Sequence, residues 1–313
     1  MKYNPERDIP DLSGKVILIT GGTAGIGKAA VFELAKHSPE QIYFTGRNAQ
    51  AGAGIIAEAK QSSPRCAVTF IKCDLSASRE DIRNSIQDQF KSSRLDILIA
   101  NAGIMAVPPA LGAEGFEIQF TSNYLGHAIL LKLLRPLMVK TAKSSPDSDA
   151  RLVMLSSFGH TVHLPGGIDF DSLRTPDAGT ALQRYGQSKL ADILLAKSMA
   201  KHYPQITSVS VHPGLVRTNL ADNVEPSFMF SILTSLTWTP LYSSAEQGAY
   251  NALWAATAPK GSVENGAYYD PVGKKAGKKG QTSGLADAGR DKDLAERLWK
   301  WTEDELKGLE DLS

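Results

Sequence analysis

Cysteine is scarce in this sequence, which contains only Cys66 and Cys73. Their number and spacing fit neither a disulfide framework nor a thiolate metal site, so we expect a reducing compartment and no bound metal. His160 and His163 lie in a loop rich in glycine and proline without a carboxylate ligand set, which favours a solvent-facing or substrate-lining role over metal binding. Residues 1–13 are polar and lack the apolar stretch of a signal peptide. These absences predict a cytoplasmic protein.

Long apolar runs are missing as well. The longest tract, 228–242, is interrupted by serines, threonines and a proline, and it is shorter than the roughly 20 residues that a spanning helix needs. An excess of one charge is also absent, because 34 lysines and arginines face 33 aspartates and glutamates. We therefore expect no membrane span and no nucleic-acid partner, which leaves small molecules as the expected ligands.

Short apolar runs and helical patterns alternate along the chain. The run at 15–20 is apolar and β-branched and stops at glycines, which is typical of a strand buried on both faces of a parallel sheet. Further strands are expected at 41–45, 67–72, 95–100, 151–156, 207–211 and 267–269. Helices are expected at 26–37, 49–60, 79–91, 117–139, 180–202, 243–257 and 291–307. This alternation predicts an α/β fold of the Rossmann type: a doubly wound parallel sheet of about seven strands with helices on both faces.

No linker interrupts this order, so we expect a single domain over 1–313, with its core at about 14–270 and a C-terminal helix at about 291–307. Two segments, at about 160–181 and 220–242, depart from the alternation, and both follow strands. Because ligands of such folds bind beyond the carboxyl ends of the strands, both segments are candidate substrate lids. The apolar tract in the second predicts a bulky apolar or aromatic substrate. Packing in a core or a dimer contact is an equally weighted alternative.

A glycine-rich turn joins the first expected strand to its helix. Glycines permit positive φ and close backbone approach, and the helix N-terminus offers free N–H groups to a phosphate. In this strand and helix context, the turn predicts dinucleotide binding. The residues assigned to it are Gly21, Thr23, Ala24, Gly25, Ile26 and Gly27.

The end of the second strand indicates which dinucleotide binds. A carboxylate there would accept hydrogen bonds from a free ribose 2′-hydroxyl, but the sequence has Arg47 and Asn48 instead. The planar, permanently charged guanidinium of Arg47 suits a 2′-phosphate, which favours NADP(H) as the cofactor. The alternative is that Arg47 merely begins a solvated helix.

Tyr185 and Lys189 are four residues apart in a strong helical run, and therefore lie on one face, one turn from each other. A free tyrosine titrates near pH ~10, but a neighbouring ammonium and a positive nicotinamide both favour the phenolate form. Tyr185 is thus a candidate acid/base. A Tyr and a Lys at this spacing occur often by chance, so the interpretation depends on the surrounding motifs.

Taken together and in order, these motifs resemble those of the short-chain dehydrogenase/reductase (SDR) family. The resemblance rests on the glycine spacing of 20–27, on Asp74-Leu75, on Asn101-Ala102-Gly103, on the segments 121–127 and 155–157, and on the pair Tyr185 and Lys189. It implies that Asp74 holds the adenine and that cofactor contacts come from the segment after the sixth strand. Those contacts are assigned to Pro213, Gly214, Val216 and Thr218.

The same resemblance implies catalytic roles. Ser157 is expected to hydrogen-bond the substrate oxygen, and Tyr185 to pass the proton. Lys189 is expected to bind the nicotinamide ribose and to tune Tyr185, while Asn123 positions a water in the proton relay. Ser156 is the alternative to Ser157.

Within the family, the segments 123–127, 156–160 and 185–191 most resemble the retinol-dehydrogenase and WW-domain-oxidoreductase-like branch, in the form of a soluble microbial or fungal reductase. This implies an NADP(H)-dependent oxidoreductase acting on CH–OH groups, which interconverts an alcohol with a ketone or aldehyde. It also implies a homodimer or homotetramer, with the helices at 117–139 and 180–202 pairing across a two-fold axis. Two other functions are kept as alternatives: lyase, epimerase or cyclase chemistry, and NADP(H) sensing without turnover.

Overall fold

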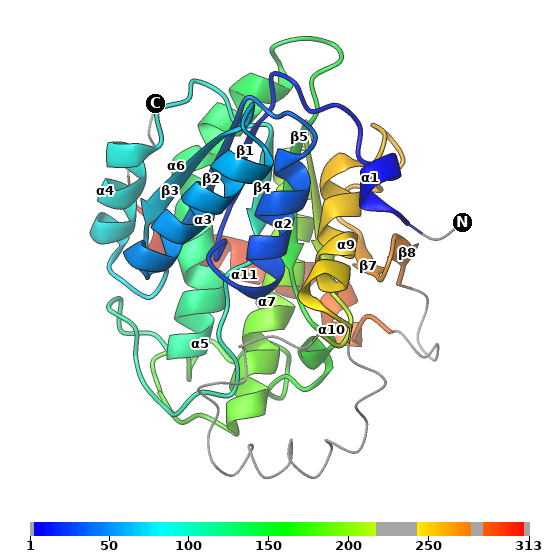
Figure 1. Cartoon of the computed structure of the whole chain (residues 1–313). Helices are drawn as coiled ribbons and strands as arrows, with labels where there is room; N and C mark the ends of the chain where they lie inside the picture. The colour runs from blue at the N-terminus through cyan, green and yellow to red at the C-terminus, as the bar shows by residue number, and fades with distance from the viewer. Residues whose placement is uncertain (1–2, 217–242, 277–283, 310–313) are drawn as a thin grey trace.

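The computed structural model describes residues 3–216, 243–276 and 284–309, and its centre is one eight-stranded sheet (Figure 1). The strand order is β3-β2-β1-β4-β5-β6-β7-β8. The strands are β1 (Val16–Ile19), β2 (Gln41–Gly46), β3 (Ala67–Lys72), β4 (Ile97–Ala100), β5 (Ala150–Leu155), β6 (Ile206–Val211), β7 (Tyr268–Asp270) and β8 (Lys274–Lys275). Strands β1 to β7 pair in parallel, and β8 pairs antiparallel with β7. The predicted parallel sheet is confirmed, and β8 is an addition that the sequence did not indicate.

The central strands are apolar because both faces of the sheet are covered. Every residue of β1, β4 and β5 is buried, as expected for parallel strands between two helical layers. Strand β1 lies between β2 and β4, so the direction of winding reverses at the β1–β4 boundary. In doubly wound folds, ligands bind at the carboxyl ends of the strands beside such a reversal.

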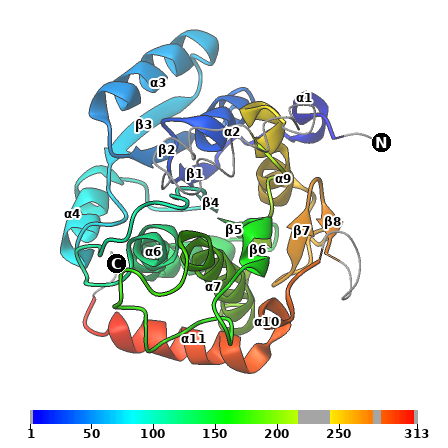
Figure 2. The same ribbon diagram turned by 90° about the horizontal axis from the view of Figure 1, so that it is seen from below.

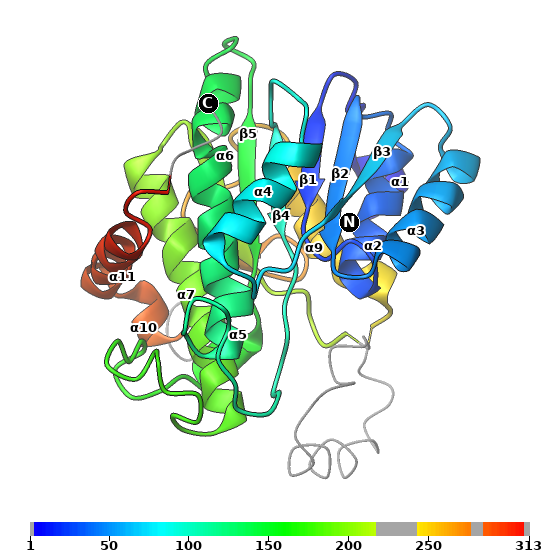
Figure 3. The ribbon, with the colours of Figure 1, turned by 90° about the vertical axis from the view of Figure 1, so that its left-hand side faces the viewer.

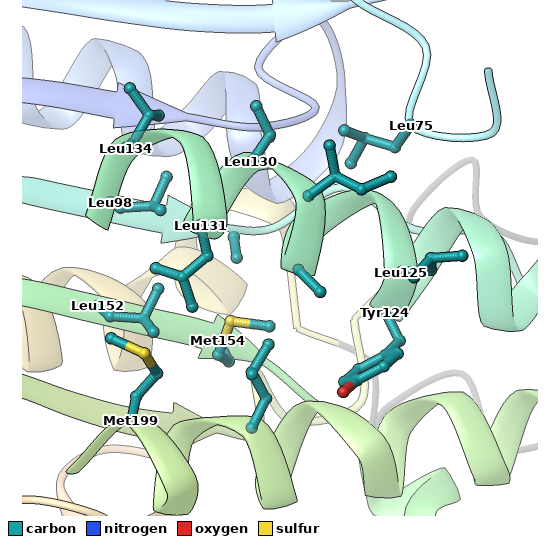
Figure 4. Packing of buried hydrophobic residues seen from close by; sticks show 14 of the residues in the cluster. Leu75, Leu98, Tyr124, Leu125, Leu130, Leu131, Leu134, Leu152, Met154 and Met199 are labelled. Carbon is teal, nitrogen blue, oxygen red and sulfur yellow. The ribbon is translucent and has the colours of Figure 1, made fainter. Parts of the chain in front are cut away.

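Helices form a layer on each face of the sheet, as Figure 2 shows. The helices are α1 (Pro5–Asp8), α2 (Gly25–Ala35), α3 (Ala49–Ser62), α4 (Arg79–Gln89), α5 (Ile118–Phe120), α6 (Gly126–Ala142), α7 (Ala181–His202), α9 (Ala245–Thr257), α10 (Asp287–Arg290) and α11 (Lys292–Glu305). Helices α2, α3 and α9 cover one face, and α4, α6 and α7 cover the other. A separate hydrophobic cluster fills each interface. Figure 4 shows the cluster between the sheet and the layer of α4, α6 and α7, where Leu131 of α6, Met154 of β5 and Met199 of α7 pack together.

Helix α11 lies outside α6 and α7, as a third layer on that side (Figure 3). Its Thr302 hydroxyl is 2.5 Å from the Tyr124 hydroxyl, and Ser198 of α7 donates to the carbonyl of Ala295 at 3.1 Å. Trp301 packs edge-on against Phe120 at 5.8 Å between ring centroids. A partner chain that approached these two helices from this side would meet α11.

The helix predicted at 117–139 is confirmed as one helical run over 118–142, but it contains a π-turn that the sequence did not indicate. The run consists of α5, the π-helical turn η1 (Thr121–Leu125) and α6, and the residues at both junctions keep α-helical backbone angles. In η1 the N–H of Gly126 bonds to the carbonyl of Thr121, five residues back. A π-turn of this kind shifts the carbonyls of one helical turn out of register and is frequent at functional sites. The segment that carries Asn123 therefore has its own geometry.

The two candidate lid segments differ in what the structure describes. The first, 160–181, contains the end of the 3₁₀ turn η2 (Phe158–Thr161) and buries Ile168 and Leu173 in the hydrophobic cluster beneath α7. The second, 220–242, and Thr218 lie outside the described residues. Among the described residues, no helix has the length and apolar character that crossing a membrane requires.

Candidate active site

Four segments gather at the carboxyl edge of the sheet, because β1, β4, β5 and β6 are neighbours and run in parallel. Each strand is followed by a motif that the sequence singled out. The segments are the glycine loop 20–27, the turn 101–103, the serines 156–157 and the segment 212–216. Helix α7, which carries Tyr185 and Lys189, packs against β5 and β6. The fold thus brings the predicted cofactor and chemical residues to one edge.

The glycine loop is a close-packed backbone turn. Gly21 has φ 68° and Gly25 has φ 52°, in the left-handed region that favours glycine. A Cβ at Gly27 would stand 2.2 Å from the carbonyl oxygen of Gly21. Ala24 is the N-cap of α2 and makes no side-chain cap bond, so the first N–H groups of the helix remain for an anion. These features fit the phosphates of a dinucleotide.

Thr20 ties the glycine loop to the turn that follows β4. Its hydroxyl oxygen accepts from the N–H groups of Asn101 and Ala102, both at 2.9 Å. The Asn101 amide donates in return to the carbonyl of Thr20 at 2.8 Å. With its two acceptor positions filled, the Thr20 hydroxyl donates to Nε2 of His127, 2.7 Å away.

His127 carries this connection on to Asn123. Its Nδ1 lies 2.6 Å from the carbonyl oxygen of Asn123 and donates to it. Burial lowers the pKa of His127 to about 4, which keeps the ring neutral with its proton on Nδ1. Thr20 and His127 both stand in motifs singled out from the sequence, at 20–27 and 121–127, but neither was assigned a role there.

Asn123 is fixed by its side chain. The amide oxygen accepts from the N–H of Ile104 at 2.8 Å, and the amide nitrogen donates to the carbonyl of Ile104 at 3.0 Å and to Oγ of Ser188 at 2.8 Å. A Cβ at Gly103 would lie 3.1 Å from the Asn123 amide oxygen and 3.6 Å from Nζ of Lys189. Asn123, Lys189 and the turn after β4 are therefore in one cluster.

Lys189 is buried, with 4% of its surface exposed. Its ammonium donates to the carbonyl of Leu155, the last residue of β5, at 2.8 Å and to Oδ2 of Asp192 at 2.9 Å. Desolvation raises the pKa of Asp192 to about 7, against the opposing effect of the Lys189 charge. Asp192 is a third residue of the site, after Thr20 and His127, to which the sequence motifs gave no role.

Tyr185 stands one turn before Lys189 on α7, which begins with a capping box formed by Thr180 and Gln183. Its ring packs against the backbone of Gly159: a Cβ there would be 2.7 Å from the ring and 3.4 Å from Oγ of Ser157. Tyr185 and Ser157 therefore border the same small space.

The two candidate serines have different surroundings. Ser156 is buried and its hydroxyl donates to the carbonyl of Lys189 at 2.7 Å. Ser157 is partly exposed and accepts from the N–H of Gly159 at 3.0 Å, which leaves its proton free to donate. This geometry favours Ser157 over Ser156 as the group that meets a substrate.

The segment after β6 returns to the glycine loop. Gly214 has φ 90°, and a Cβ at Gly248 of α9 would touch Val216 at 2.7 Å and Ile26 at 3.2 Å. Val216 thus lies beside Ile26 of the glycine loop, and Pro213 and Gly214 stand between it and the end of β6. Thr218, expected to contact the cofactor, is not among the described residues.

The far end of the predicted cofactor site lies beyond β2 and β3. Arg47 is exposed directly after β2, while the Asn48 side chain accepts from the N–H of Ala51 at 3.0 Å and caps α3. Asp74 accepts from the backbone and hydroxyl of Ser76 at 2.9 and 2.7 Å. Leu75 is buried against Gly126 of α6. The edge that would meet the adenosine thus presents a guanidinium and one fixed carboxylate.

The loop histidines have protein partners. His160 is fully buried, contrary to the solvent-facing or substrate-lining expectation, with Nδ1 2.6 Å from the carbonyl of Ser157 and Nε2 accepting from the N–H of Ala286 at 3.1 Å. Nδ1 of His163 lies 2.6 Å from the carbonyl of Leu164. In the described part of the chain, no cluster of three or more His, Cys, Asp or Glu is arranged to hold a metal.

Comparisons with known proteins decide the family. The profile of the short chain dehydrogenase family matches residues 15–227. The chain belongs to the SDR family. A short-chain dehydrogenase/reductase of Aspergillus calidoustus, drtF, is 37% identical over 314 residues, covering 96% of each chain. Retinol dehydrogenase 12 of Mus musculus is 31% identical over 92% of this chain and 85% of its own.

Solved structures agree with this assignment. An uncharacterized protein of Mycobacterium paratuberculosis has a TM-score of 0.74 at 25% identity, with 98% of both chains covered. The resemblance to fungal SDR proteins and to the retinol dehydrogenase branch, predicted from the motifs, is confirmed by these relatives.

Proposed function

We propose that this SDR protein is an NADP(H)-dependent oxidoreductase that interconverts an alcohol with a ketone or aldehyde. The observation that carries the proposal is the position of Tyr185, which shares one space with Ser157 and stands one helical turn from the buried Lys189 ammonium. The glycine loop lies at the same edge of the sheet. An acid/base, a hydrogen-bond donor and a dinucleotide cradle are the parts that carbonyl reduction requires.

The roles of the chain's own residues follow from their surroundings. The free proton of Ser157 holds the substrate oxygen, and Tyr185 gives its proton to that oxygen as negative charge develops there. Lys189 keeps a positive charge beside Tyr185, which favours the phenolate that remains. Asn123 holds the backbone of Ile104, directly after the turn 101–103, and so keeps that turn close to Lys189. When bound, the nicotinamide supplies or takes up the hydride.

NADP(H) is proposed over NAD(H) because of the residues after β2. Positions 45–48 carry no carboxylate, and Arg47 is exposed at this edge. A guanidinium binds a 2′-phosphate through charge-assisted hydrogen bonds, whereas a free 2′-hydroxyl gains little from it.

The proposed substrate is bulky and apolar or aromatic. Phe158 and Leu215 follow β5 and β6 and are 51% and 53% exposed, which places large apolar side chains at the open edge of the site. Exposed apolar groups of this size commonly mark a binding surface. We further propose that 160–181 borders the substrate site.

The test is turnover with defined probes. NADPH absorbance is followed with aryl ketones, quinones and aliphatic aldehydes, for the wild type and for Tyr185→Phe. The proposal predicts oxidation of NADPH with at least one bulky carbonyl and a loss of about 10²–10⁴-fold in the variant. Equal rates for the two proteins would exclude Tyr185 as the acid/base. NADPH binding without turnover of any probe would favour the sensing alternative.

A further inference from the structure

Asp192 is a buried carboxylate on α7, one turn beyond Lys189. Its side chain is 1% exposed, and that of Lys189 is 5% exposed. Oδ2 of Asp192 accepts from the Lys189 ammonium at 2.9 Å, and the carbonyl of Leu155 accepts a second hydrogen bond from it at 2.8 Å. Since an ammonium has three N–H donors, these two contacts fix the direction of the third.

The other carboxylate oxygen of Asp192 has no such contact. Oδ1 is buried and has no hydrogen-bond partner among the described residues. Burying a carboxylate with one unsatisfied oxygen carries a desolvation penalty that lowers the stability of the fold. A neutral amide of the same shape would pack equally well without the charge. Packing therefore does not account for the charge at position 192.

Two groups that face this pair from neighbouring elements, Tyr124 and His127, are neutral, and the carboxylate near Tyr124 is paired with two cations. The Tyr124 hydroxyl of η1 interacts with Asp192, and burial raises its pKa above the ordinary value. His127 of α6 faces Lys189, and burial lowers its pKa to about 4. Glu303 of α11 is neutralised by Lys132 and Arg135, both within 2.8 Å. The charged group that interacts with Asp192 at neutral pH is thus Lys189.

We propose that Asp192 is a positioning residue for proton transfer: it holds the Lys189 ammonium toward the turn 101–103, and its negative charge sets the pH range in which Tyr185 works. The inference rests on the proposed function. Asp192 does not touch the substrate; it acts through Lys189. Removal of its charge makes the neighbouring groups release their protons at lower pH, because a negative charge favours their protonated forms.

The test compares pH profiles of kcat for NADPH-dependent turnover. Asp192→Asn and Asp192→Ser remove the charge, whereas Asp192→Glu keeps it. In both neutral variants the alkaline limb of the profile, which lies where Asp192 is ionised, is expected to move to lower pH by about one unit. Asp192→Glu is expected to keep its limbs close to those of the wild type. Two neutral variants are used so that misfolding of one leaves the other to decide.

Asp96→Asn is the matched control. Asp96 is equally buried and paired with Lys15 and Arg94, but it lies just before β4, at the opposite end of the sheet. Its removal is expected to lower thermal stability and to leave both limbs in place. If folded Asp192→Asn or Asp192→Ser keeps the pH profile of the wild type while Tyr185→Phe is inactive, the role proposed for Asp192 is wrong and the proposed function stands. Equal turnover by Tyr185→Phe and wild type would overturn the proposed function instead.

Discussion

The hydroxyl of Thr20 and Nε2 of His127 are 2.7 Å apart, and this contact joins the glycine loop to the helix that carries Asn123. Thr20 also accepts from two backbone N–H groups of the turn after β4. One hydroxyl therefore holds together three segments of the site that are far apart in the sequence.

Replacement of Thr20 by valine tests this connection. The isosteric change leaves the N–H groups of Asn101 and Ala102 and the ring of His127 without their partner, at a cost of about 1–3 kcal/mol for a buried unsatisfied group. We expect a lower free energy of unfolding in urea and weaker NADPH binding. Thr69→Val, in β3 and away from the glycine loop, is the control. An equal loss of stability in both variants would contradict the special role of Thr20.

The sequence predicted the fold well where the local pattern and the tertiary environment agree. The strand expected at 67–72 has the same bounds as β3, because its β-branched residues Val68, Thr69 and Ile71 favour a strand there. Lys274 and Lys275 form β8 by pairing with β7, which the sequence did not indicate. A two-residue strand has no periodicity to detect. Helices α1 and α10 were missed for the same reason.

The site was predictable in its motifs but not in its connections. Asn123, Ser157, Tyr185 and Lys189 could be named because each stands in a recognisable motif. Asp192 could have been found from its spacing of three residues after Lys189, which places both on one helical face. The contact of Thr20 with His127 spans 107 positions, so it depends on the fold and leaves no local signal.

The pH dependence of stability tests the buried histidines. His127 has a folded-state pKa of about 4, below the value of about 6.5 expected in the unfolded chain. The unfolded state therefore binds the proton first, and the stabilising contribution of His127 is present above pH ~6.5 and lost as the pH falls toward ~4. The loss amounts to roughly 3 kcal/mol, at ~1.4 kcal/mol for each unit between the two pKa values.

The variant His127→Gln isolates this contribution from that of Asp192. The raised pKa of Asp192 changes the free energy of unfolding with pH in the opposite direction. The difference in unfolding free energy between wild type and His127→Gln is expected to shrink as the pH is lowered from ~7 to ~4. A difference that stays constant over this range would show that His127 does not titrate in the folded state as described.

Gly27 and Gly54 form a matched pair of helical glycines. An alanine at Gly27 would drive its Cβ into the carbonyl of Gly21 at 2.2 Å, whereas nothing lies within 4 Å of a Cβ at Gly54. Gly27→Ala is expected to weaken NADPH binding at least about tenfold, through about 1–3 kcal/mol of overpacking strain in the loop. Gly54→Ala is expected to bind normally and to gain about 0.5–1 kcal/mol of stability. Isothermal titration calorimetry measures binding, and urea unfolding measures stability. Unaltered NADPH binding by Gly27→Ala would show that the glycine loop does not bind the phosphates.

The proposed preference for NADP(H) rests on Arg47. Arg47→Ala is expected to raise the Kd for NADPH by about 10–100-fold, the ~1.5–3 kcal/mol of a charged hydrogen bond, and to leave the Kd for NADH unchanged. Lys60→Ala, which removes an exposed charge from the last turn of α3, is the control. If the Kd values for both cofactors rise alike, Arg47 has no specific role toward the 2′-phosphate.

The most direct measurement follows the hydride itself. The protein is incubated with a bulky carbonyl probe and NADPH carrying deuterium at one or the other face of nicotinamide C4, and the alcohol product is analysed by mass spectrometry. The account predicts one deuterium on the carbinol carbon from one labelled form and none from the other, with product lost in Tyr185→Phe. Product that carries no deuterium from either form would contradict it.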